Sequence, residues 1–306
     1  MKNEKKSSNK APISVIITTF NDYEYLDQAI KSVLAQSLLP SELIVIDDGS
    51  DLAEAETITN RFIENNKGVS ISFYRKENGG ASSSRNLGIQ KAIYDYIAFL
   101  DVDDKMLPNN LLDKYNLIEN LDESYFGVYG SAIRSTGEIE NFPDIDGVAD
   151  ADKLDIQGEG IPGGSPFFLF NKSSLIQVNG FDEKLKCNED YDILIRLIKT
   201  EKRVKGCVPA GFYRNIRPNS LSRPANPTKL FERVMFFLEK AERLNYYSID
   251  YLNQRKMSAY ITYTKGLLGN KEFIKAFRYA RKGFKYSKPV TNKQKLVYLV
   301  SFQWLW

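Results

Sequence analysis

The chain contains no histidine and only two cysteines, Cys187 and Cys207, among its 306 residues. Without histidine, the Ser–His and Cys–His nucleophilic systems are excluded, and so is the usual zinc ligand. Any acid–base chemistry must therefore fall mainly to carboxylates, lysine, tyrosine or cysteine. Two cysteines form no disulfide framework, which is typical of a reducing cytoplasm.

Long apolar runs are also missing. No stretch approaches the roughly 20 apolar residues that a membrane-spanning helix needs. The first ten residues, MKNEKKSSNK, are polar and lack the apolar segment of a signal peptide. We therefore expect residues 1–11 to be a disordered lead-in, and we expect the protein to be cytoplasmic.

Charge divides the chain into two parts. From Ala225 to Trp306 there are 16 basic against 5 acidic residues, a net charge of +11. The remaining residues carry 26 basic against 34 acidic side chains, a net charge of −8. This asymmetry calls for separate interpretations of an acidic body and a basic C-terminal tail.

The first hundred residues alternate between two hydrophobic patterns. Short apolar runs typical of buried strands are followed by segments with apolar residues at helical spacing. The expected strands are 13–18, 43–46, 69–74 and 96–100, and the expected helices are 23–36, 54–65 and 82–93. This alternation predicts an α/β fold, with a mostly parallel sheet and helices on both faces.

The rest of the chain is expected to complete this domain and add a second part. The polar segment 136–164 is predicted to form loops. The other expected elements are helices at 109–120 and 189–199, strands at 126–133 and 167–170, a hairpin or two edge strands at 204–208 and 211–216, a linker or lid at 217–227, and helices at 228–244, 251–268 and 271–286. We therefore predict an α/β domain at 12–224 and a basic helical extension at 225–306.

Acidic side chains gather where the expected strands end. Asp101, Asp103 and Asp104 follow the fourth strand, and Asp47 and Asp48 follow the second. The carboxyl ends of parallel strands meet at one edge of a sheet, so these groups should converge. Crowded carboxylates repel one another unless a cation lies among them, and Mg²⁺ or Mn²⁺ prefers such oxygen ligands together with substrate phosphates. The pattern predicts a metal–phosphate site, and the structural alternative is a solvated acidic turn that caps the next helix.

Seven short segments, in order along residues 12–222, make the chain resemble the family-2 glycosyltransferases with a GT-A fold. They are SVIITTFN (14–21), VIDDGS (45–50), ENGGA (77–81), SRNLG (84–88), FLDVDD (99–104), GFDE (180–183) and EDYD (189–192). Each is weak alone, but the seven in register are a strong match. The resemblance implies a Rossmann-like GT-A domain that binds a nucleotide-sugar donor, followed by the C-terminal helical extension.

The resemblance implies a binding site for the donor's base. Thr18 and Phe20 would line the base, and Asp48, with Asp47 beside it, would bind the base's edge. A carboxylate can accept the imide N–H of uracil, which favours a UDP-sugar. Asn78 belongs to a glycine-containing turn that would bring backbone close to the donor. The structural alternative for residues 47–50 is a helix N-cap and turn.

Two arginines are implied to act near the diphosphate. Arg85 would lie close to it or brace the carboxylates, because its planar fork matches both groups. A surface salt bridge within a helix is the alternative. Arg217, in a basic, serine-containing segment that includes Ser220 and Ser222, would close over the diphosphate as a lid.

The resemblance also implies a metal site and a catalytic base. Asp101-Val-Asp103 matches the DxD motif: Asp103 would ligate a Mn or Mg divalent cation, and Asp101 would hold the ribose or a water bound to the metal. Asp190, with Glu189 beside it, matches the base that deprotonates the acceptor hydroxyl, which would invert the anomeric carbon in one displacement. Many relatives carry a histidine near residue 217, so here water or phosphate oxygens would complete the metal shell. Favourable charge at a helix N-terminus is the alternative for residues 189–190.

The basic tail is open to two interpretations. Lysines and arginines of 271–286 can occupy one helix face, which either is a solvated face of a packed helix or binds anionic lipid at the inner face of the plasma membrane. The aromatic segment Val297–Trp306 favours the membrane, which would make the protein peripheral. Nucleic acid is not an expected partner, because the acidic body would oppose it.

These observations predict a metal-dependent inverting glycosyltransferase. It would move one sugar from a nucleotide-sugar to a glycan or lipid-linked acceptor in bacterial surface polysaccharide synthesis; the Gln-x-x-Arg-Trp signature of processive members is absent. A sugar-phosphate nucleotidyltransferase would need a glycine-rich basic loop where the chain has TTFN. A non-catalytic sugar-nucleotide-binding module would have lost the carboxylates. A dinucleotide oxidoreductase would need G-x-G-x-x-G after the first strand.

Overall fold

The computed structural model describes residues 10–66, 68–217, 226–289 and 295, which separate into two compact units. The first unit comprises the described residues up to Lys184 together with Glu189–Ile216. The second comprises Leu185–Asn188 and the described residues from Arg217 onward. The domain boundary predicted from the sequence, at 224, falls in a segment outside the described residues.

One half of the first unit's sheet is parallel. Its strands are β1 (Lys10–Thr19), β2 (Leu39–Asp47), β3 (Ser70–Arg75) and β4 (Tyr96–Asp101), in the spatial order β3-β2-β1-β4. The connecting helices are α1 (Tyr23–Leu34), α2 (Glu54–Asn65) and α3 (Ala81–Lys91). The lead-in predicted at residues 1–11 is too long, because Lys10 and Ala11 already belong to β1, where they pair with Leu39 and Pro40 of β2.

The other half of the sheet mixes directions. β9 (Phe168–Asn171) lies antiparallel between β4 and β6 (Tyr125–Arg134), and β10 (Arg203–Arg214) runs parallel to β6. Three two-residue strands complete the sheet: β5 (Lys105–Met106), β7 (Ile139–Glu140) and β8 (Asp146–Gly147). The prediction of a hairpin or two edge strands at 204–208 and 211–216 is wrong. β10 is one strand that pairs with β6 along its whole length, and shifts in the pairing register accommodate its extra residues.

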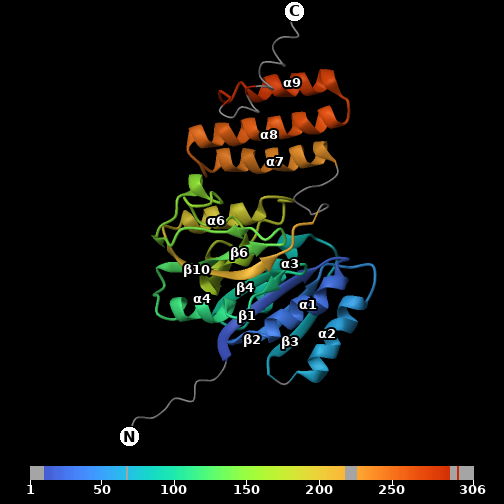
Figure 1. The fold of residues 1–306 in the computed structure, drawn as a ribbon, viewed down its shortest axis with the longest axis vertical. Helices are drawn as coiled ribbons and strands as arrows, with labels where there is room; N and C mark the ends of the chain where they lie inside the picture. Colours follow the sequence, from blue (N-terminus) through green and yellow to red (C-terminus); the bar gives the residue numbers. More distant parts are fainter. Residues whose placement is uncertain (1–9, 67, 218–225, 290–294, 296–306) are drawn as a thin grey trace, which may run out of the picture. The chain divides into compact units, whose positions relative to one another are not determined.

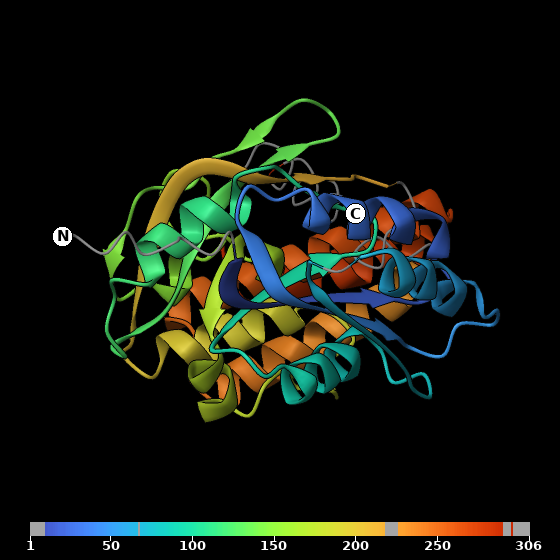
Figure 2. The same ribbon diagram turned by 90° about the horizontal axis from the view of Figure 1, so that it is seen from below.

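Helices cover both faces of the sheet, as predicted. Figure 2 shows α1 and α4 (Asn110–Ile118) on one side of the twisted sheet and α3 on the other. Leu26 of α1, Ala55 of α2 and Leu111 of α4 share one buried cluster with the strands. On the opposite face, a Cβ at Gly88 would come within 2.5 Å of Ile16, so the glycine lets α3 approach β1 closely.

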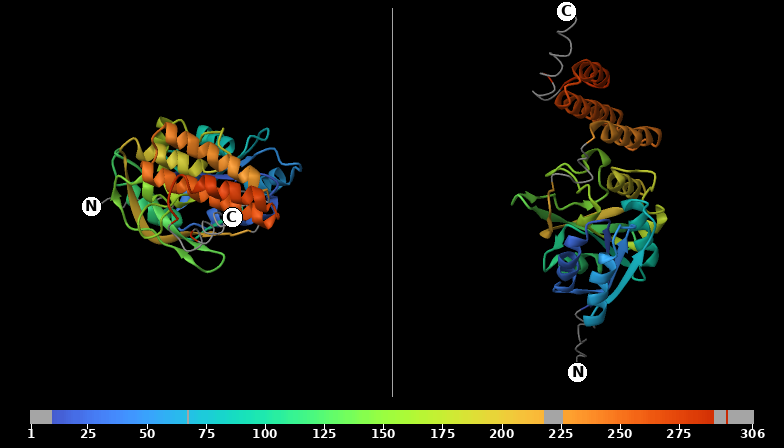
Figure 3. Two further views of the ribbon diagram at one scale, coloured as in Figure 1. Left: turned by 90° about the horizontal axis from the view of Figure 1, so that it is seen from above. Right: turned by 90° about the vertical axis from the view of Figure 1, so that its right-hand side faces the viewer.

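Two further helices complete the first unit. α5 (Lys172–Gln177) follows β9. α6 (Glu189–Ile198) lies on the same side of the sheet as α3 (Figure 3). The side chains of Ile193, Leu194 and Leu197 are buried, at the helical spacing that the sequence displays. α6 is thereby anchored by its apolar face, which fixes the position of the two acidic residues at its start.

The described residues of the second unit form the helices α7 (Pro227–Arg243), α8 (Ile249–Gly269) and α9 (Phe273–Gly283), which pack against one another in sequence, as Figure 3 shows. The Asn226 side chain caps α7, and the Ser248 hydroxyl caps α8. Phe231 stacks on Tyr263 with ring centroids 4.6 Å apart. These contacts give the extension its own small core.

The outer face of α9 is basic. Ala276, Ala280 and Gly283 are buried, and a Cβ at Gly283 would come within 2.6 Å of Tyr260. The exposed cations are Lys271, Lys275, Arg278, Lys282 and Lys285. Phe273 and Ile274, at the start of the helix, are 55% and 82% exposed, because the helix packs through small residues instead.

Membrane association stays a prediction. The aromatic segment Val297–Trp306 lies outside the described residues. Among the helices of the described residues, none is long and apolar enough to cross a bilayer.

Candidate functional site

The parallel strands bring the predicted site to one edge of the sheet, where β1, β2 and β4 end (Figure 1). In the register of the sheet, Thr18 lies between Ile46 of β2 and Asp101 of β4. Neighbouring strands are about 4.8 Å apart, so the backbones of Ile46 and Asp101 are roughly 10 Å apart across Thr18. The segments that follow these strands therefore begin side by side along one edge of the sheet.

The turn after β2 is held to the end of β1. The backbone N–H of Asp48 donates to the Thr19 carbonyl at 2.9 Å, and the N–H of Asn21 donates to the Ser50 hydroxyl at 2.9 Å. Phe20, between these anchored residues, is 46% exposed. An aromatic ring held on a fixed backbone and left open to solvent can stack on a base.

The two aspartates of this turn have different surroundings. Asp47 is buried; its Oδ1 accepts hydrogen bonds from the backbone N–H and the hydroxyl of Ser50. Its Oδ2 makes no hydrogen bond and lies 3.5 Å from Nε of Arg75. Asp47 therefore stabilises the turn, which makes it a support for the predicted binding of a base edge at Asp48.

Asp48 is surrounded by donors from the segment after β3. It accepts hydrogen bonds from Nζ of Lys76 at 2.7 Å and from the backbone N–H groups of Gly79 and Gly80 at 3.0 and 2.7 Å. Burial raises the pKa of Asp48, but these donors outweigh burial and hold the pKa below its ordinary value. Asp48 is therefore ionised over the physiological pH range.

Arg85 of α3 lies among three of the predicted carboxylates. Its guanidinium is 6% exposed and lies 3.0 Å from Asp101, 3.4 Å from Glu189 and 3.7 Å from Asp190. Burial lowers the pKa of Arg85, but the charges of these three carboxylates outweigh burial and raise the pKa above its ordinary value. The surface salt bridge considered as an alternative is wrong, because the arginine is buried and joins β4 to α6.

Two motifs cooperate to hold Arg85. The Asn86 side chain donates to the Phe181 carbonyl at 2.9 Å and accepts from the Phe181 N–H at 2.8 Å. The Phe181 ring then lies under the guanidinium, 5.3 Å from its carbon to the ring centroid. Gly180 has φ of +62°, and a Cβ there would come within 2.5 Å of the Asn86 amide, so glycine is required. The sequence motifs SRNLG and GFDE thus form one support for the arginine.

Asp190 lies at the start of α6 with a raised pKa. It lies in the first turn of α6, and its Oδ1 is buried without a hydrogen-bond partner. Burial raises its pKa most, Arg85 opposes the rise, and the charges of Glu189 and Asp101 add to it, so the pKa is about 6. A carboxylate with this pKa is ionised at neutral pH and is a stronger base than an ordinary aspartate.

The turn after β4 carries the DxD carboxylates. Asp101 is 40% exposed and Asp103 is half-buried, so both can face a ligand. Among the described residues, no group of three or more acidic, cysteine or histidine side chains is arranged to hold a metal by itself. Two carboxylates with room for phosphate and water oxygens match the way in which Mg²⁺ and Mn²⁺ are usually held. The residues therefore fit a metal that shares its ligands with a substrate.

The turn after β4 has a second support that its own sequence does not reveal. Asp104 is buried and accepts the backbone N–H of Asn215, at the end of β10, at 2.8 Å. Burial, together with the charges of Asp101 and Asp103, raises the pKa of Asp104 to about 8 against the opposing effects of Asn215 and Arg214. The acidic run itself was visible in the sequence, but its partner is more than a hundred residues away.

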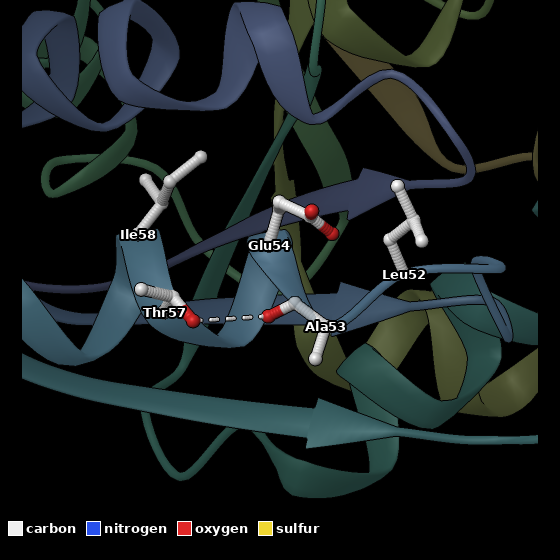
Figure 4. Close-up of a pocket in the computed structure, with 5 residues that line it drawn as sticks. All are labelled: Leu52, Ala53, Glu54, Thr57 and Ile58. Atoms are coloured by element: carbon white, nitrogen blue, oxygen red, sulfur yellow. Dashed lines mark hydrogen bonds between the residues drawn. The ribbon is translucent and has the colours of Figure 1, made fainter.

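A separate hollow of about 380 Å³ opens at the start of α2 and is lined by Leu52, Ala53, Glu54, Thr57 and Ile58 (Figure 4). It follows the turn after β2 in sequence. Its mostly apolar lining contains none of the predicted site residues. The chemistry of the site therefore lies elsewhere along this edge.

Contacts join two groups of the predicted residues. The structure brings Arg85, Asp101, Glu189 and Asp190 into contact, and it joins Asp48 to the segment that contains Asn78, whose own side chain is exposed. Arg217 belongs to the second unit, so its predicted role as a lid stays a prediction. Ser220 and Ser222 lie outside the described residues.

Comparison with known proteins agrees with this geometry. The model of the family "Glycosyl transferase family 2" matches residues 14–177, more than half of the chain. An uncharacterized glycosyltransferase of Rickettsia bellii is 31% identical over 209 residues, 65% of this chain and 29% of the relative. The poly(ribitol-phosphate) beta-N-acetylglucosaminyltransferase TarP of Staphylococcus aureus is 36% identical over 147 residues, 47% of this chain and 44% of TarP. The chain thus spans less than half the length of both relatives.

Solved structures share the fold. TarS of S. aureus, residues 1–349 in complex with UDP-GlcNAc, has a TM-score of 0.64 at 16% identity, covering 95% of this chain and 90% of that one. The mannosyltransferase PcManGT of Pyrobaculum calidifontis, in complex with GDP-Man and Mn²⁺, has a TM-score of 0.59 at 15% identity, covering 95% and 85%. The predicted GT-A fold is confirmed. The ordered motifs, the family match and the fold agree, and the chain belongs to glycosyl transferase family 2.

Proposed function

We propose that this protein is a metal-dependent inverting glycosyltransferase that moves one sugar from a UDP-sugar to a hydroxyl of a glycan or lipid-linked acceptor. The setting we propose is bacterial surface polysaccharide synthesis, with the basic face of α9 at the inner membrane surface. The names of TarP and of the TarS complex make UDP-GlcNAc the first donor to test.

The contact of Arg85 with Asp101 and Asp190 is the observation that carries this proposal. One buried guanidinium joins the carboxylate that would face the donor to the carboxylate that would face the acceptor. A strand end and a helix start that are 89 residues apart in sequence are thereby held together. Such a connection is expected where donor and acceptor must be aligned for a single displacement.

On the donor side, the chain supplies binding and orientation. Phe20 offers a stacking surface, Asp48 offers an ionised acceptor, and Asp101 and Asp103 offer carboxylate oxygens beside the diphosphate. A divalent cation bound there would neutralise charge on the departing UDP, which removes the need for a protein general acid. This fits a chain without histidine.

On the acceptor side, the chemistry belongs to Asp190. Its carboxylate takes the proton of the acceptor hydroxyl as that oxygen bonds to the anomeric carbon and the bond from this carbon to the UDP oxygen breaks. Attack from the face opposite UDP inverts the configuration. A hydrolase that inverts would use two opposed carboxyl groups, whereas here one base suffices.

The donor-binding half of this proposal is tested with Asp103→Ala. Titration calorimetry with UDP-, GDP- and dTDP-sugars should show Mn²⁺-assisted binding of UDP-sugars. The variant should weaken this binding by about 100-fold, because the carboxylate proposed to ligate the metal is lost. Asp27→Ala, which removes a carboxylate from an ion pair on α1, should leave binding unchanged. Mn²⁺-assisted binding that survives in Asp103→Ala would contradict the metal site.

Assays of the products released separate the rival functions. A sugar-phosphate nucleotidyltransferase would release pyrophosphate from a nucleoside triphosphate and a sugar phosphate. A non-catalytic binding module would take up the donor without turning it over with any acceptor or with water.

The pH dependence follows from the raised pKa of Asp190. The base must be ionised, so kcat/KM should fall as pH drops below about 6 and be level above it. Glu189 raises the pKa of Asp190, so Glu189→Gln should move this limb to lower pH. Rates measured between about pH 4.5 and 8 decide the matter. A profile of the unmodified protein that stays nearly level down to pH 4.5, as the ordinary carboxyl pKa of 3.8 would give, would contradict the assignment.

A further inference from the structure

Lys76 is a largely buried partner of Asp48, and it lies outside the seven sequence segments shared with the family. It follows β3 directly, and its ammonium is bonded to Asp48 at 2.7 Å and to the Glu77 carbonyl at 2.5 Å. The side chain of Lys76 is 19% exposed and that of Asp48 is 5% exposed. A cation and an anion therefore lie together at the sheet edge where the base is proposed to bind.

Each of the two groups has capacity left. A carboxylate has about four acceptor positions, and Asp48 receives three hydrogen bonds, from Lys76, Gly79 and Gly80. An ammonium has three donors, and Lys76 uses two. The pair can thus present one free acceptor position beside one free donor.

The backbone around this pair is closely packed, which fixes its position. A Cβ at Gly49, where φ is +80°, would come within 2.9 Å of the Lys76 carbonyl. A Cβ at Gly79 would come within 2.9 Å of the Lys76 ammonium and 2.8 Å of the Ser83 hydroxyl. The Lys76 N–H also donates to the Asp47 carbonyl at 3.0 Å. The backbone that carries the lysine is therefore held in place, which prepares the pair for a ligand.

We propose that Lys76 is a specificity-determining residue which, together with Asp48, reads a base edge that has an N–H beside a C=O. Uracil, thymine and guanine present this edge. Cytosine and adenine present a ring nitrogen acceptor beside an amino group, which would face Asp48 with an acceptor and Lys76 with a donor. This inference rests on the proposed function, and it extends that function from one carboxylate to an acceptor–donor pair.

The physical basis is the cost of mismatched polar groups. A base with the wrong edge leaves the carboxylate and the ammonium desolvated without partners, which a protein tolerates poorly. A carboxylate alone would discriminate less, because a base amino group could also donate to it. The lysine makes the second position selective as well.

The test is titration calorimetry of the full chain with UDP, GDP, CDP and ADP in the presence of Mn²⁺. The unmodified protein should bind UDP or GDP at least about 10-fold more tightly than CDP or ADP, and the UDP and GDP arms show which base fits. In Lys76→Met the affinity for the preferred nucleotide should fall about 10-fold, with little change in the affinity for CDP. The ratio between the two affinities should therefore become smaller. Lys76→Arg, which keeps a cationic donor, should retain most of the preference. Lys91→Met, which removes an exposed lysine from α3, is the matched control.

Each outcome decides something. An unchanged preference in Lys76→Met overturns this inference and leaves the proposed function intact. An equal loss for all four nucleotides, in Lys76→Met and in the milder Lys76→Gln, assigns the lysine to the stability of the turn and also overturns it. If the unmodified protein binds none of the four nucleotides, the proposed function fails and this inference fails with it.

Discussion

Asp190→Asn is expected to slow sugar transfer at least about 100-fold while the affinity for the donor stays unchanged. The amide has nearly the same size as the carboxyl group but cannot accept the proton of the acceptor hydroxyl. Asp190 contacts Arg85 at 3.7 Å, a longer separation than that between Arg85 and Asp101, so donor-side geometry should persist. The effect should therefore appear in kcat and not in donor binding.

Two variants control this experiment. Asp27→Asn alters a carboxylate of similar exposure in an ion pair on α1 and should leave the rate unchanged. Glu189→Gln removes the neighbouring acid and should cost less than Asp190→Asn, because Glu189 acts on the base through its charge. A transfer rate for Asp190→Asn within threefold of the unmodified enzyme would exclude this residue as the base.

Arg85→Met should destabilise the protein by about 3 kcal/mol, because a buried cation that pairs with three carboxylates is lost. The lower end of the range for broken buried ion pairs applies, since Asp101 is 40% exposed and can be solvated. For a domain of this size the loss corresponds to a fall in Tm of roughly 6–12 °C. Thermal unfolding measured by calorimetry without Mn²⁺ checks the value.

A second measurement distinguishes the electrostatic role of Arg85 from a merely structural one. The arginine lowers the pKa of Asp190, so its removal should move the acidic limb of the kcat/KM profile from about 6 to higher pH. Arg61→Met, which removes an exposed arginine from α2, should change neither Tm nor the profile. An Arg85→Met variant with an unmoved limb and normal Tm would show that the three-carboxylate contact has no energetic importance.

The fold of the first hundred residues was predictable because local signals and tertiary contacts agree there. The interiors of β1, β2 and β4 are apolar and buried, and α1 shows a buried apolar stripe. The edge strand β3 is only half-buried, and α3 packs mainly through small and polar residues. The predictions failed where pairing partners decide. β10 is one long strand because β6 lies beside it along its whole length, and Lys10 is part of β1 because β2 offers it a partner.

The site divides in the same way. The identities of the acidic residues and their order along the chain could be read directly, since strand ends in a parallel sheet meet at one edge. The positions of Lys76, Asn86, Phe181 and Asn215 beside them could not, because each acts through a contact with a distant segment. The helical pattern of α9 also did not predict which residues pack. It places the alanines, the glycine and the apolar residues Phe273 and Ile274 close together, but only the small residues are buried.

By itself, the sequence determined the family, the parallel sheet and the set of carboxylates available for chemistry, since these depend on residue type and spacing alone. Only the tertiary structure decided that a buried arginine joins Asp101 to Asp190 and that a lysine accompanies Asp48. The physical reason is that charge acts over a few ångströms of space, and the distance between two side chains is set by how the whole sheet and its helices pack.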